Sequence, residues 1–158
     1  MIRELIERYI ADSDLPARSI AGLSREQLLA HPIQGTWSIQ EVILHVMDSD
    51  LVASDRMKRV IAGPNPTLLA YDENNYIARL GYDRLDAKLA CEIFRLNRLM
   101  TGAILRNLPD SDFARVGQHT ERGDESLRQI VQIYVDHLHH HFKFLRAKRV
   151  ALGLPAGD

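Results

Sequence analysis

The stretch Gln132–Leu145 reads Gln-Ile-Tyr-Val-Asp-His-Leu-His-His-His-Phe-Lys-Phe-Leu, and it decides how the rest of the chain is interpreted. The stretch lies in a segment with the features of a long helix. Ser126 and Gln129 form the start pattern of a capping box, and neither Gly nor Pro follows before Gly153. We therefore predict one uninterrupted helix that carries four of the seven histidines of the chain.

Helical rotation separates these four histidines from one another. The helix has a broad apolar arc, which comprises Ile130, Ile133, Tyr134, Leu138, Phe144 and Leu145. At about 100° per residue, His137 and His141 lie inside this arc one turn apart, His140 lies at its edge, and His139 faces away. Two histidines at positions i and i+4 of a buried face can converge on one metal ion. On this helix alone, two core histidines hydrogen-bonded to neighbours explain the pattern equally well.

A metal site on this helix needs at least one further ligand from elsewhere in the chain. The remaining histidines are His31, His45 and His119. A purification tag is a poor explanation for the histidine run, because the run has three members and lies inside the chain.

Composition describes an ordinary globular protein. The 158 residues suffice for one domain with a core, with 46% hydrophobic and 26% charged residues. A net charge of −1, with acids and bases mixed, gives no support for binding nucleic acid or for a polybasic membrane contact. We recognise no signal peptide and no membrane-spanning run, and the single Cys91 excludes an intramolecular disulfide and a thiolate zinc cluster. We expect a cytoplasmic location.

Periodicity and start signals predict two long helical segments in the first half of the chain. Residues 2–11 form an amphipathic helix that resumes at 17–23 after an interruption. The second helix begins at Ser38, where Glu41 completes a capping box, and stops at Gly63.

A polar line runs along this second, otherwise apolar helix. It consists of Glu41, His45, Asp48, Ser49 and Arg56. Polar groups on a buried helix are costly unless they are paired. The line is therefore either a surface strip with ion pairs such as Asp55 with Arg59, or a face turned toward a site with His45 as the third ligand.

A third long helix is predicted from Asp83, as its N-cap, to Pro109. Its expected core stripe consists of Leu85, Leu89, Ile93, Leu96, Met100 and Ala103. Cys91 lies on the opposite side from that stripe, and we interpret it as a structural or partner-facing thiol, because the pattern places no base near it.

The fold class expected from these segments is all-α, a four-helix bundle formed by a single domain over residues 1–158. No stretch has the pattern of a sheet. The segment Pro64–Tyr82 has no sustained period and is long enough to cross the bundle, which lets the second and third helices run parallel. Metal sites in such bundles are built from side chains that project inward from facing helices.

Several motifs in a fixed order carry a resemblance to a known family. The first is Gly-Thr-Trp-Ser-Ile-Gln-Glu-Val at 35–42, followed by His-Val-Met-Asp-Ser at 45–49. It is similar to the pattern G-W-S/T-x-x-E/Q-V-x-x-H-x-x-D-S of the DinB/YfiT-like family of damage-inducible four-helix proteins. Arg-Met-Lys at 56–58 and Pro66 with Tyr-Asp-Glu at 71–73 also resemble the YfiT-type branch. The residues 134–141 are similar to its closing Y-x-x-H-x-x-H-H pattern, so the resemblance covers nearly the whole chain.

The resemblance implies an up-down-down-up bundle, often a homodimer, with one divalent metal ion held by His45, His137 and His141. Zinc or nickel is the expected metal, with iron possible, since three imidazoles suit each of them. The family includes S-transferases and isomerases that use a low-molecular-weight thiol, and metal-dependent hydrolases. A small-molecule substrate is therefore expected, as is a metal that lowers the pKa of a water or thiol.

Three further residues are candidates for catalytic roles. Asp48 is expected to orient an imidazole, with Asp72 as the second candidate, while a plain surface acid is the alternative for Asp48. Arg56 is a candidate for an anionic substrate group or a structural ion pair. The chain departs from many relatives at Lys143-Phe144 and at Tyr76, which leaves the substrate open. The alternatives to an enzyme are a non-catalytic metal-binding stress-response protein and a bundle whose histidines belong to the core.

Overall fold

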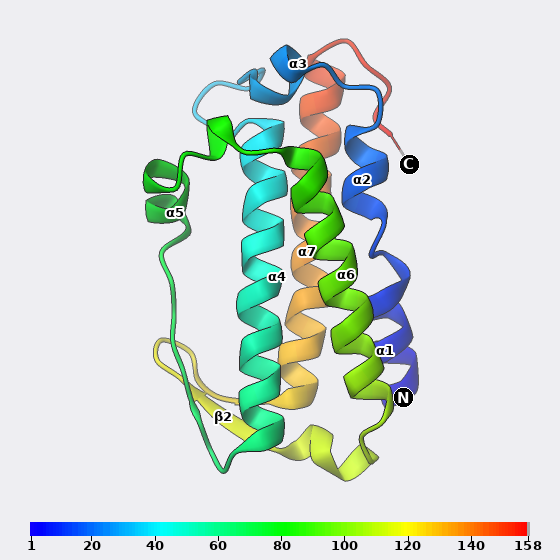
Figure 1. The fold of residues 1–158 in the computed structure, drawn as a ribbon, viewed down its shortest axis with the longest axis vertical. Helices are drawn as coiled ribbons and strands as arrows, with labels where there is room; N and C mark the ends of the chain where they lie inside the picture. Colours follow the sequence, from blue (N-terminus) through cyan, green and yellow to red (C-terminus); the bar gives the residue numbers. More distant parts are fainter. Residues whose placement is uncertain (158) are drawn as a thin grey trace.

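The computed structural model describes residues 1–157 and shows the predicted bundle (Figure 1). Its first arm contains α1 (Ile2–Ala11) and α2 (Leu15–Ile20), and the other three arms are α4 (Ile39–Ala62), α6 (Ala87–Arg106) and α7 (Leu127–Ala151). In Figure 1 the first arm ascends, α4 and α6 both descend, and α7 ascends again. The up-down-down-up order and the parallel pair are therefore confirmed. No helix among residues 1–157 is both long and apolar enough to cross a membrane.

The predicted capping boxes begin the helices where the sequence places them. The Ser38 hydroxyl accepts the Glu41 backbone N–H at 3.1 Å, and the Ser126 hydroxyl accepts that of Gln129 at 3.3 Å. Each serine backbone N–H is in turn paired with the side chain three residues on. The short α3 (Arg25–Leu29) begins at Ser24 in the same way. These reciprocal bonds satisfy N–H groups that have no partner inside the helix.

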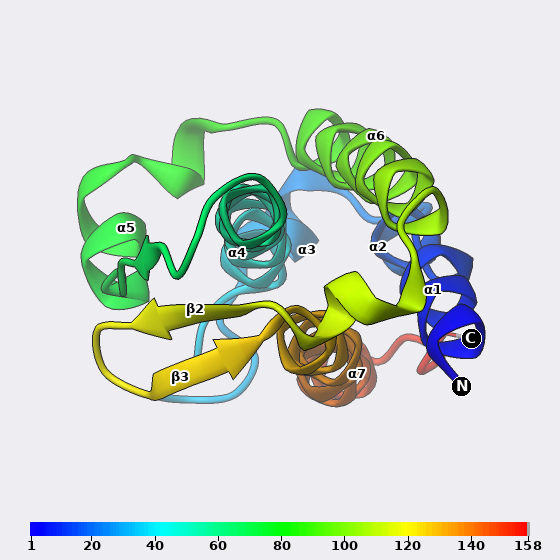
Figure 2. The ribbon, with the colours of Figure 1, turned by 90° about the horizontal axis from the view of Figure 1, so that it is seen from below.

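A small sheet corrects the expectation that the chain has none. Strands β1 (Thr67–Leu68), β2 (Val116–His119) and β3 (Gly123–Ser126) form it in that order. The pair β1–β2 is parallel and the pair β2–β3 antiparallel, and Leu68 lies opposite His119. Strands of two and four residues are too short to show a period of two. The sheet joins the crossover to the connection before α7, beside the ends of α4 and α7 in Figure 2.

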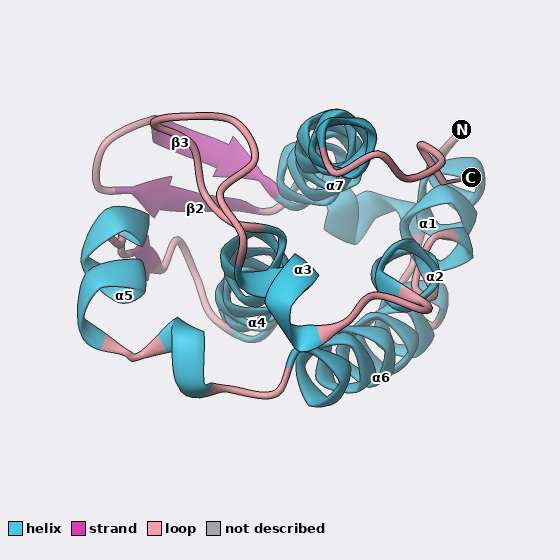
Figure 3. Cartoon of the chain, turned by 90° about the horizontal axis from the view of Figure 1, so that it is seen from above, coloured by secondary structure: helices cyan, strands magenta, loops and turns pink. Residues whose placement is uncertain are grey.

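The crossover also contains a short helix, α5 (Glu73–Arg79), and a 3-10 turn, η1 (Tyr82–Arg84). Seen from above, α5 stands apart from the four arms on the α4 side of the bundle (Figure 3). A second 3-10 turn, η2 (Asp110–Ala114), leads from α6 into the sheet. Both long connections therefore contain ordered elements, and the crossover with α5 lies on the outer side of α4.

Helix α6 differs from its prediction in both start and orientation. Its N-cap is Asp86, whose carboxylate accepts the Lys88 and Leu89 backbone N–H groups, while Asp83 lies in η1. Most of the expected core stripe is exposed, with Leu89 at 59% and Met100 at 65%. Apolar surface of this kind is what a second copy of the chain would cover, and the homodimer remains a prediction.

The buried face of α6 instead combines small residues with a few large ones. This face contains Ala87, Ala90, Cys91, Phe94, Arg98, Thr101, Gly102 and Leu105. A Cβ atom on Gly102 would lie 2.4 Å from the side chain of Ile10, so the first and third arms approach closely there. Cys91 lies on this buried face, which agrees with a structural thiol and not with a partner-facing one, and burial raises the pKa of its thiol to about 12.

A buried ion pair connects all four arms between two hydrophobic clusters. Arg98 of α6 donates from Nε to Asp50 of α4 at 2.9 Å. Its other nitrogens donate to the backbone carbonyls of Tyr9 on α1, at 3.1 Å, and Tyr134 on α7, at 2.7 Å. Asn97 donates to the second Asp50 oxygen at 2.7 Å, and both charged side chains are about 2% exposed. The pair therefore has the full set of partners that a buried charge requires.

We expect Asp50→Asn to destabilise the fold by about 3–5 kcal/mol, because it leaves the buried guanidinium of Arg98 without a counter-charge. Urea unfolding measures the change. The matched control is Glu7→Gln, which breaks the exposed ion pair with Arg106 and should change stability little. Equal effects of the two substitutions would contradict the assigned role of Asp50.

Candidate metal centre

Three imidazoles meet between α4 and α7. His45 Nε2 lies 3.2 Å from His137 Nε2 and 3.1 Å from His141 Nε2, and the last two atoms are 3.1 Å apart. His45 is buried and the other two are partly buried. The structure thus brings together the three histidines that were predicted as ligands, one turn apart on α7 and opposite each other across the helix interface.

The triangle of nitrogens has the dimensions of a metal site. Ligands at 2.0–2.1 Å from a tetrahedral ion are separated by about 3.3 Å, which is close to the observed edges. Hydrogen bonds do not explain the triangle, because each neutral imidazole offers Nε2 as either one donor or one acceptor. Three mutual contacts therefore exceed what N–H···N bonds can satisfy, and the cluster is able to hold a cation.

The local environment keeps these histidines uncharged. Burial, together with a smaller effect of neighbouring imidazoles, lowers the pKa of His45 to about 3, of His137 to about 2 and of His141 to about 4. Neutral imidazole is the form that binds a metal. The ligand set is therefore ready at neutral pH without losing protons first.

Trp37 covers one side of the cluster. Its ring is stacked on His141 with centroids 6.0 Å apart and an angle of 3°, and lies 5.0 Å from the His45 ring. The residue follows a turn in which Gly35 has φ of +74°, a conformation that favours glycine. Trp37 is also packed against the core residues around the start of α4. In the structure the same side chain packs directly on two candidate ligands.

None of the three predicted catalytic residues bonds to the histidine cluster within the described chain. Asp48 accepts a hydrogen bond from the Tyr82 hydroxyl and none from a histidine in the described chain. Asp72 is the N-cap of α5, where it accepts the Asn74 backbone N–H at 2.9 Å. An imidazole-orienting role for either carboxylate therefore has no contact to support it here.

Arg56 shares the wall of one cavity with His137, a candidate ligand. Its NH1 donates to the Tyr134 hydroxyl at 2.9 Å and its NH2 to the Leu69 carbonyl at 2.5 Å. Arg56 also lines a cavity of about 190 Å³ together with His137. It is the predicted catalytic residue that the structure places beside the candidate metal site.

Two cavities of different character reach the cluster. The first, of about 190 Å³, ends at His137 and is polar, with His119 and Tyr71 in its wall. The second, of about 230 Å³, ends at His141 and is lined mainly by Trp37, Val42 and Phe144, with Lys148 at its side. Sequence reasoning did not find Tyr71 as a site residue and considered His119 only as a ligand. Tyr71 lies in the Tyr-Asp-Glu motif at 71–73, but that motif indicated only Asp72 as a site residue.

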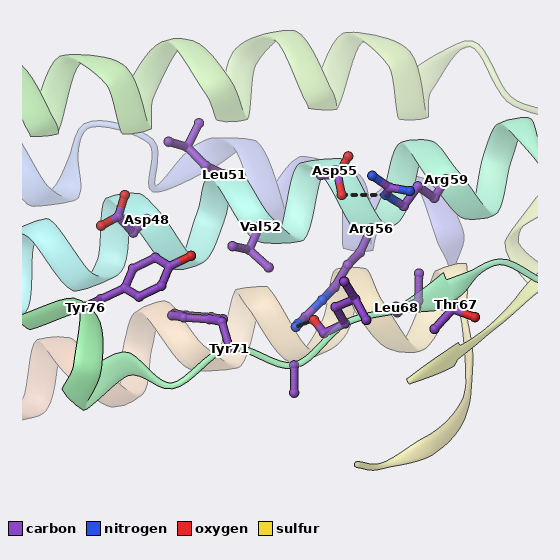
Figure 4. Close-up of a pocket in the computed structure, with 12 residues that line it drawn as sticks. Asp48, Leu51, Val52, Asp55, Arg56, Arg59, Thr67, Leu68, Tyr71 and Tyr76 are labelled. Carbon is purple, nitrogen blue, oxygen red and sulfur yellow. Dashed lines mark hydrogen bonds and ion pairs between the residues drawn. The ribbon is translucent and has the colours of Figure 1, made fainter. Parts of the chain in front are cut away.

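A third cavity, of about 540 Å³, lies between α4 and the crossover but contacts none of the three histidines. Figure 4 shows Asp48, Arg56, Tyr71 and Tyr76 around it, with the predicted Asp55–Arg59 ion pair at one end. Arg56 and Tyr71 line this cavity and also the smaller one beside His137. These two side chains therefore form the partition between the two spaces.

We expect the histidines of α7 to differ sharply on substitution. His137→Ala or His141→Ala should each lose most of the bound metal, because two imidazoles hold an ion far less well than three. His139 is exposed and lies 3.3 Å from Asp12, so His139→Ala is the matched control and should keep metal and stability. Elemental analysis after dialysis measures the difference, and equal loss in all three variants would refute the assignment.

Acid should destabilise the metal-free protein from about pH 6.5 downward, the ordinary pKa of histidine. The lowered pKa values mean that the unfolded chain binds protons there while the folded cluster does not. Their contribution to stability is thus complete above that pH and declines as the pH falls. Urea midpoints across this range measure it, and His137→Ala should flatten the slope while His139→Ala leaves it unchanged. A urea midpoint of the wild-type protein that stays constant across this pH range would contradict the prediction.

The chain is similar to curated bacterial proteins over most of its length. A protein of Bacillus licheniformis, named a "putative metal-dependent hydrolase", is 28% identical over 96% of this chain and 88% of its own. A protein of Oceanobacillus iheyensis with the same description is 30% identical over 87% of this chain and 81% of its own.

Solved structures show the same fold. YfiT from Bacillus subtilis, described as "a probable metal-dependent hydrolase with an unusual four-helix bundle topology", matches with a TM-score of 0.84 at 21% identity, over 97% of this chain and 86% of its own. A DinB-like protein of the same organism matches with a TM-score of 0.62 at 16% identity, over 96% of this chain and 92% of its own. The DinB superfamily model matches residues 13–145, and the chain therefore belongs to the DinB superfamily.

Proposed function

We propose that this protein is a metal-dependent enzyme that hydrolyses a small substrate, with His45, His137 and His141 as the ligands of one divalent ion. The observation that carries the proposal is the triangle of three Nε2 atoms 3.1–3.2 Å apart. The relatives that are named as metal-dependent hydrolases support the same class. Zinc or nickel is the metal that we propose, with iron as a further candidate.

The number of ligands favours catalysis over a purely structural site. Structural zinc sites are closed by four protein ligands, whereas catalytic sites have three and an open position. The cluster has three histidines, and the carboxylates of Asp48 and Asp72 are bonded elsewhere. A divalent ion there would lower the pKa of a water or a thiol in its open position.

The surrounding residues would hold reactants against this centre. Trp37, stacked on His141, closes one side and limits the entry of bulk water. The cavity at His137 has polar walls and the cavity at His141 has mainly apolar walls, so two different chemical groups can be held on the two sides. The ligand nitrogens lie where the two cavities approach each other.

The two cavities also favour a second candidate, transfer of a low-molecular-weight thiol to an electrophile. A hydrolase needs a space for one organic substrate besides water, whereas a thiol transferase needs spaces for two. The polar cavity suits a thiol with charged groups and the apolar one suits an electrophile with an apolar body. We rank hydrolysis first because the relatives carry that name.

The test combines metal content with turnover. We expect about one equivalent of divalent metal per chain after loading, as for tight three-histidine sites. The loaded protein should cleave members of an ester and amide panel, or consume a thiol together with a chloro-dinitro aromatic acceptor. His45→Ala should lose metal and both activities, while His139→Ala should keep them.

Two results would count against the proposal. Uptake of less than about a tenth of an equivalent, with zinc and nickel both tried, would exclude a resident metal. A metal-loaded protein whose cobalt spectrum does not respond to azide or a hydroxamate would have a closed site, which favours the non-catalytic metal-binding alternative. Incorporation of isotope-labelled water into the product separates hydrolysis from thiol transfer.

A further inference from the structure

The polar cavity beside His137 collects buried polar atoms that have no partner. Within residues 1–157, six buried side-chain nitrogen or oxygen atoms lack a hydrogen bond. Three of the six are Arg56 Nε, Tyr71 Oη and His119 Nε2, and all three residues line this one cavity of about 190 Å³. Buried polar groups are nearly always paired in folded proteins, so such a concentration in one place indicates a ligand that supplies the partners.

All three atoms are able to donate a hydrogen bond. Arg56 uses NH1 and NH2 for Tyr134 and the backbone, which leaves its Nε–H free. His119 Nδ1 accepts the backbone N–H groups of Glu121 and Arg122, at 3.2 and 3.3 Å. Because Nδ1 is an acceptor in both bonds, the hydrogen of the neutral ring is on Nε2.

Tyr71 contributes the third donor. Burial raises the pKa of its hydroxyl well above the ordinary value, so the group keeps its hydrogen at neutral pH. The Ser49 hydroxyl is close enough to oppose this rise, yet no hydrogen bond of acceptable geometry joins the two. A ligand in this cavity therefore meets three donors and should offer several acceptor atoms.

The charged residues around the cavity favour a ligand with a single negative charge. Arg56 is 4% exposed, and its hydrogen-bond partners within the described chain are a hydroxyl and a backbone carbonyl, so no carboxylate is bonded to its guanidinium. Arg122, by contrast, is neutralised by Glu125 at 2.5 Å. The exposed Glu73 and Glu121 also line the cavity and disfavour a doubly charged anion. A carboxylate meets these conditions better than a phosphate, since it is planar, singly charged and able to accept several hydrogen bonds.

We propose that this cavity binds the carboxylate group of the substrate, with Arg56 Nε, His119 Nε2 and Tyr71 Oη as its donors, and so presents the remainder of the substrate to the centre at His137. The proposal rests on the proposed function for its catalytic meaning. It adds the substrate class, a small carboxylic acid, and it assigns His119 and Tyr71 as binding residues.

The fold explains how three separated residues reach one cavity. Arg56 projects from α4, Tyr71 belongs to the crossover after β1, and His119 ends β2. Pairing of Leu68 with His119 brings the crossover and β2 together, and the Leu69 carbonyl accepts from Arg56. Figure 4 shows the Arg56 guanidinium extended from α4 to the segment that carries Tyr71. The small sheet thus brings the side chains of Arg56, Tyr71 and His119 to one cavity.

The experiment titrates metal-free protein at neutral pH with propionate and with its neutral isostere propionamide, monitored by the NMR signals of His119 and of Arg56 Nε–H. Metal-free protein is used because a carboxylate also binds a metal ion. We expect saturable shifts of both signals with propionate and at least about tenfold weaker binding of propionamide, since charge-assisted hydrogen bonds are the stronger ones. Inorganic phosphate should bind more weakly than propionate.

Arg56→Gln should weaken propionate binding by at least about tenfold. The matched control is Arg59→Gln, one turn further on the same helix, which removes an exposed charge paired with Asp55 and should leave binding unchanged. Tyr71→Phe should weaken binding while preserving the shape of the wall.

Any one of three results would overturn the proposal. These are equal binding of propionate and propionamide, tighter binding of phosphate than of propionate, and propionate binding that leaves the NMR signals of His119 unshifted. If Arg56→Gln does not fold, the comparison of propionate with propionamide on the wild-type protein still decides. Because neither metal nor turnover enters the measurement, failure here is distinct from failure of the proposed hydrolase activity.

Discussion

The buried pair of Asp50 and Arg98 is the interaction on which the arrangement of the four arms depends. A hydrophobic stripe tolerates small shifts of one helix along another, whereas a buried guanidinium loses stability as soon as one partner moves away. Arg98 donates to Asp50 on α4 and to backbone carbonyls on α1 and α7, so it fixes all three relative to α6. These hydrogen bonds therefore set the position of α4 relative to α7 along the bundle.

Tyr134 connects the Asp50–Arg98 ion pair to the candidate metal centre. Its backbone carbonyl accepts from Arg98, and its hydroxyl accepts from Arg56 at 2.9 Å. His137 comes one turn later on the same helix, with its ring 5.8 Å from that of Tyr134. The same residue therefore links the structural ion pair, the arginine of the polar cavity and one candidate ligand. Ligands must be held within a fraction of an ångström to bind a metal well, and a rigid polar layer beside them serves that need.

Sequence patterns predicted most of the helices and their order. They failed for the buried face of α6 and for side-chain partners that are far apart in the sequence. The starts at Ser38 and Ser126, the crossover and the convergence of His45 with the α7 pair follow from local signals that the structure retains. The predicted buried face of α6 was wrong, because most of its large apolar residues are exposed. The observed face combines small residues that allow close approach, such as Gly102, with Phe94 and Arg98. A periodicity analysis gives the large apolar residues the most weight, so it assigns the buried face of α6 to the side on which its leucines lie. The partners of Asp48 and Arg98 depend on contacts 34 and 48 residues apart, which no local pattern encodes.

The parts that escaped prediction are also the parts that distinguish this chain chemically. Three imidazoles in a bundle describe a site that can serve many reactions, and a fold alone does not select among them. Selection comes from what surrounds the ligands. Here the polar wall is built from α4, the crossover and β2, and its unpaired donors lower the stability of the unliganded protein. On our proposal a bound carboxylate supplies the missing partners, so that the connections set the substrate preference while α4 and α7 provide the three candidate metal ligands.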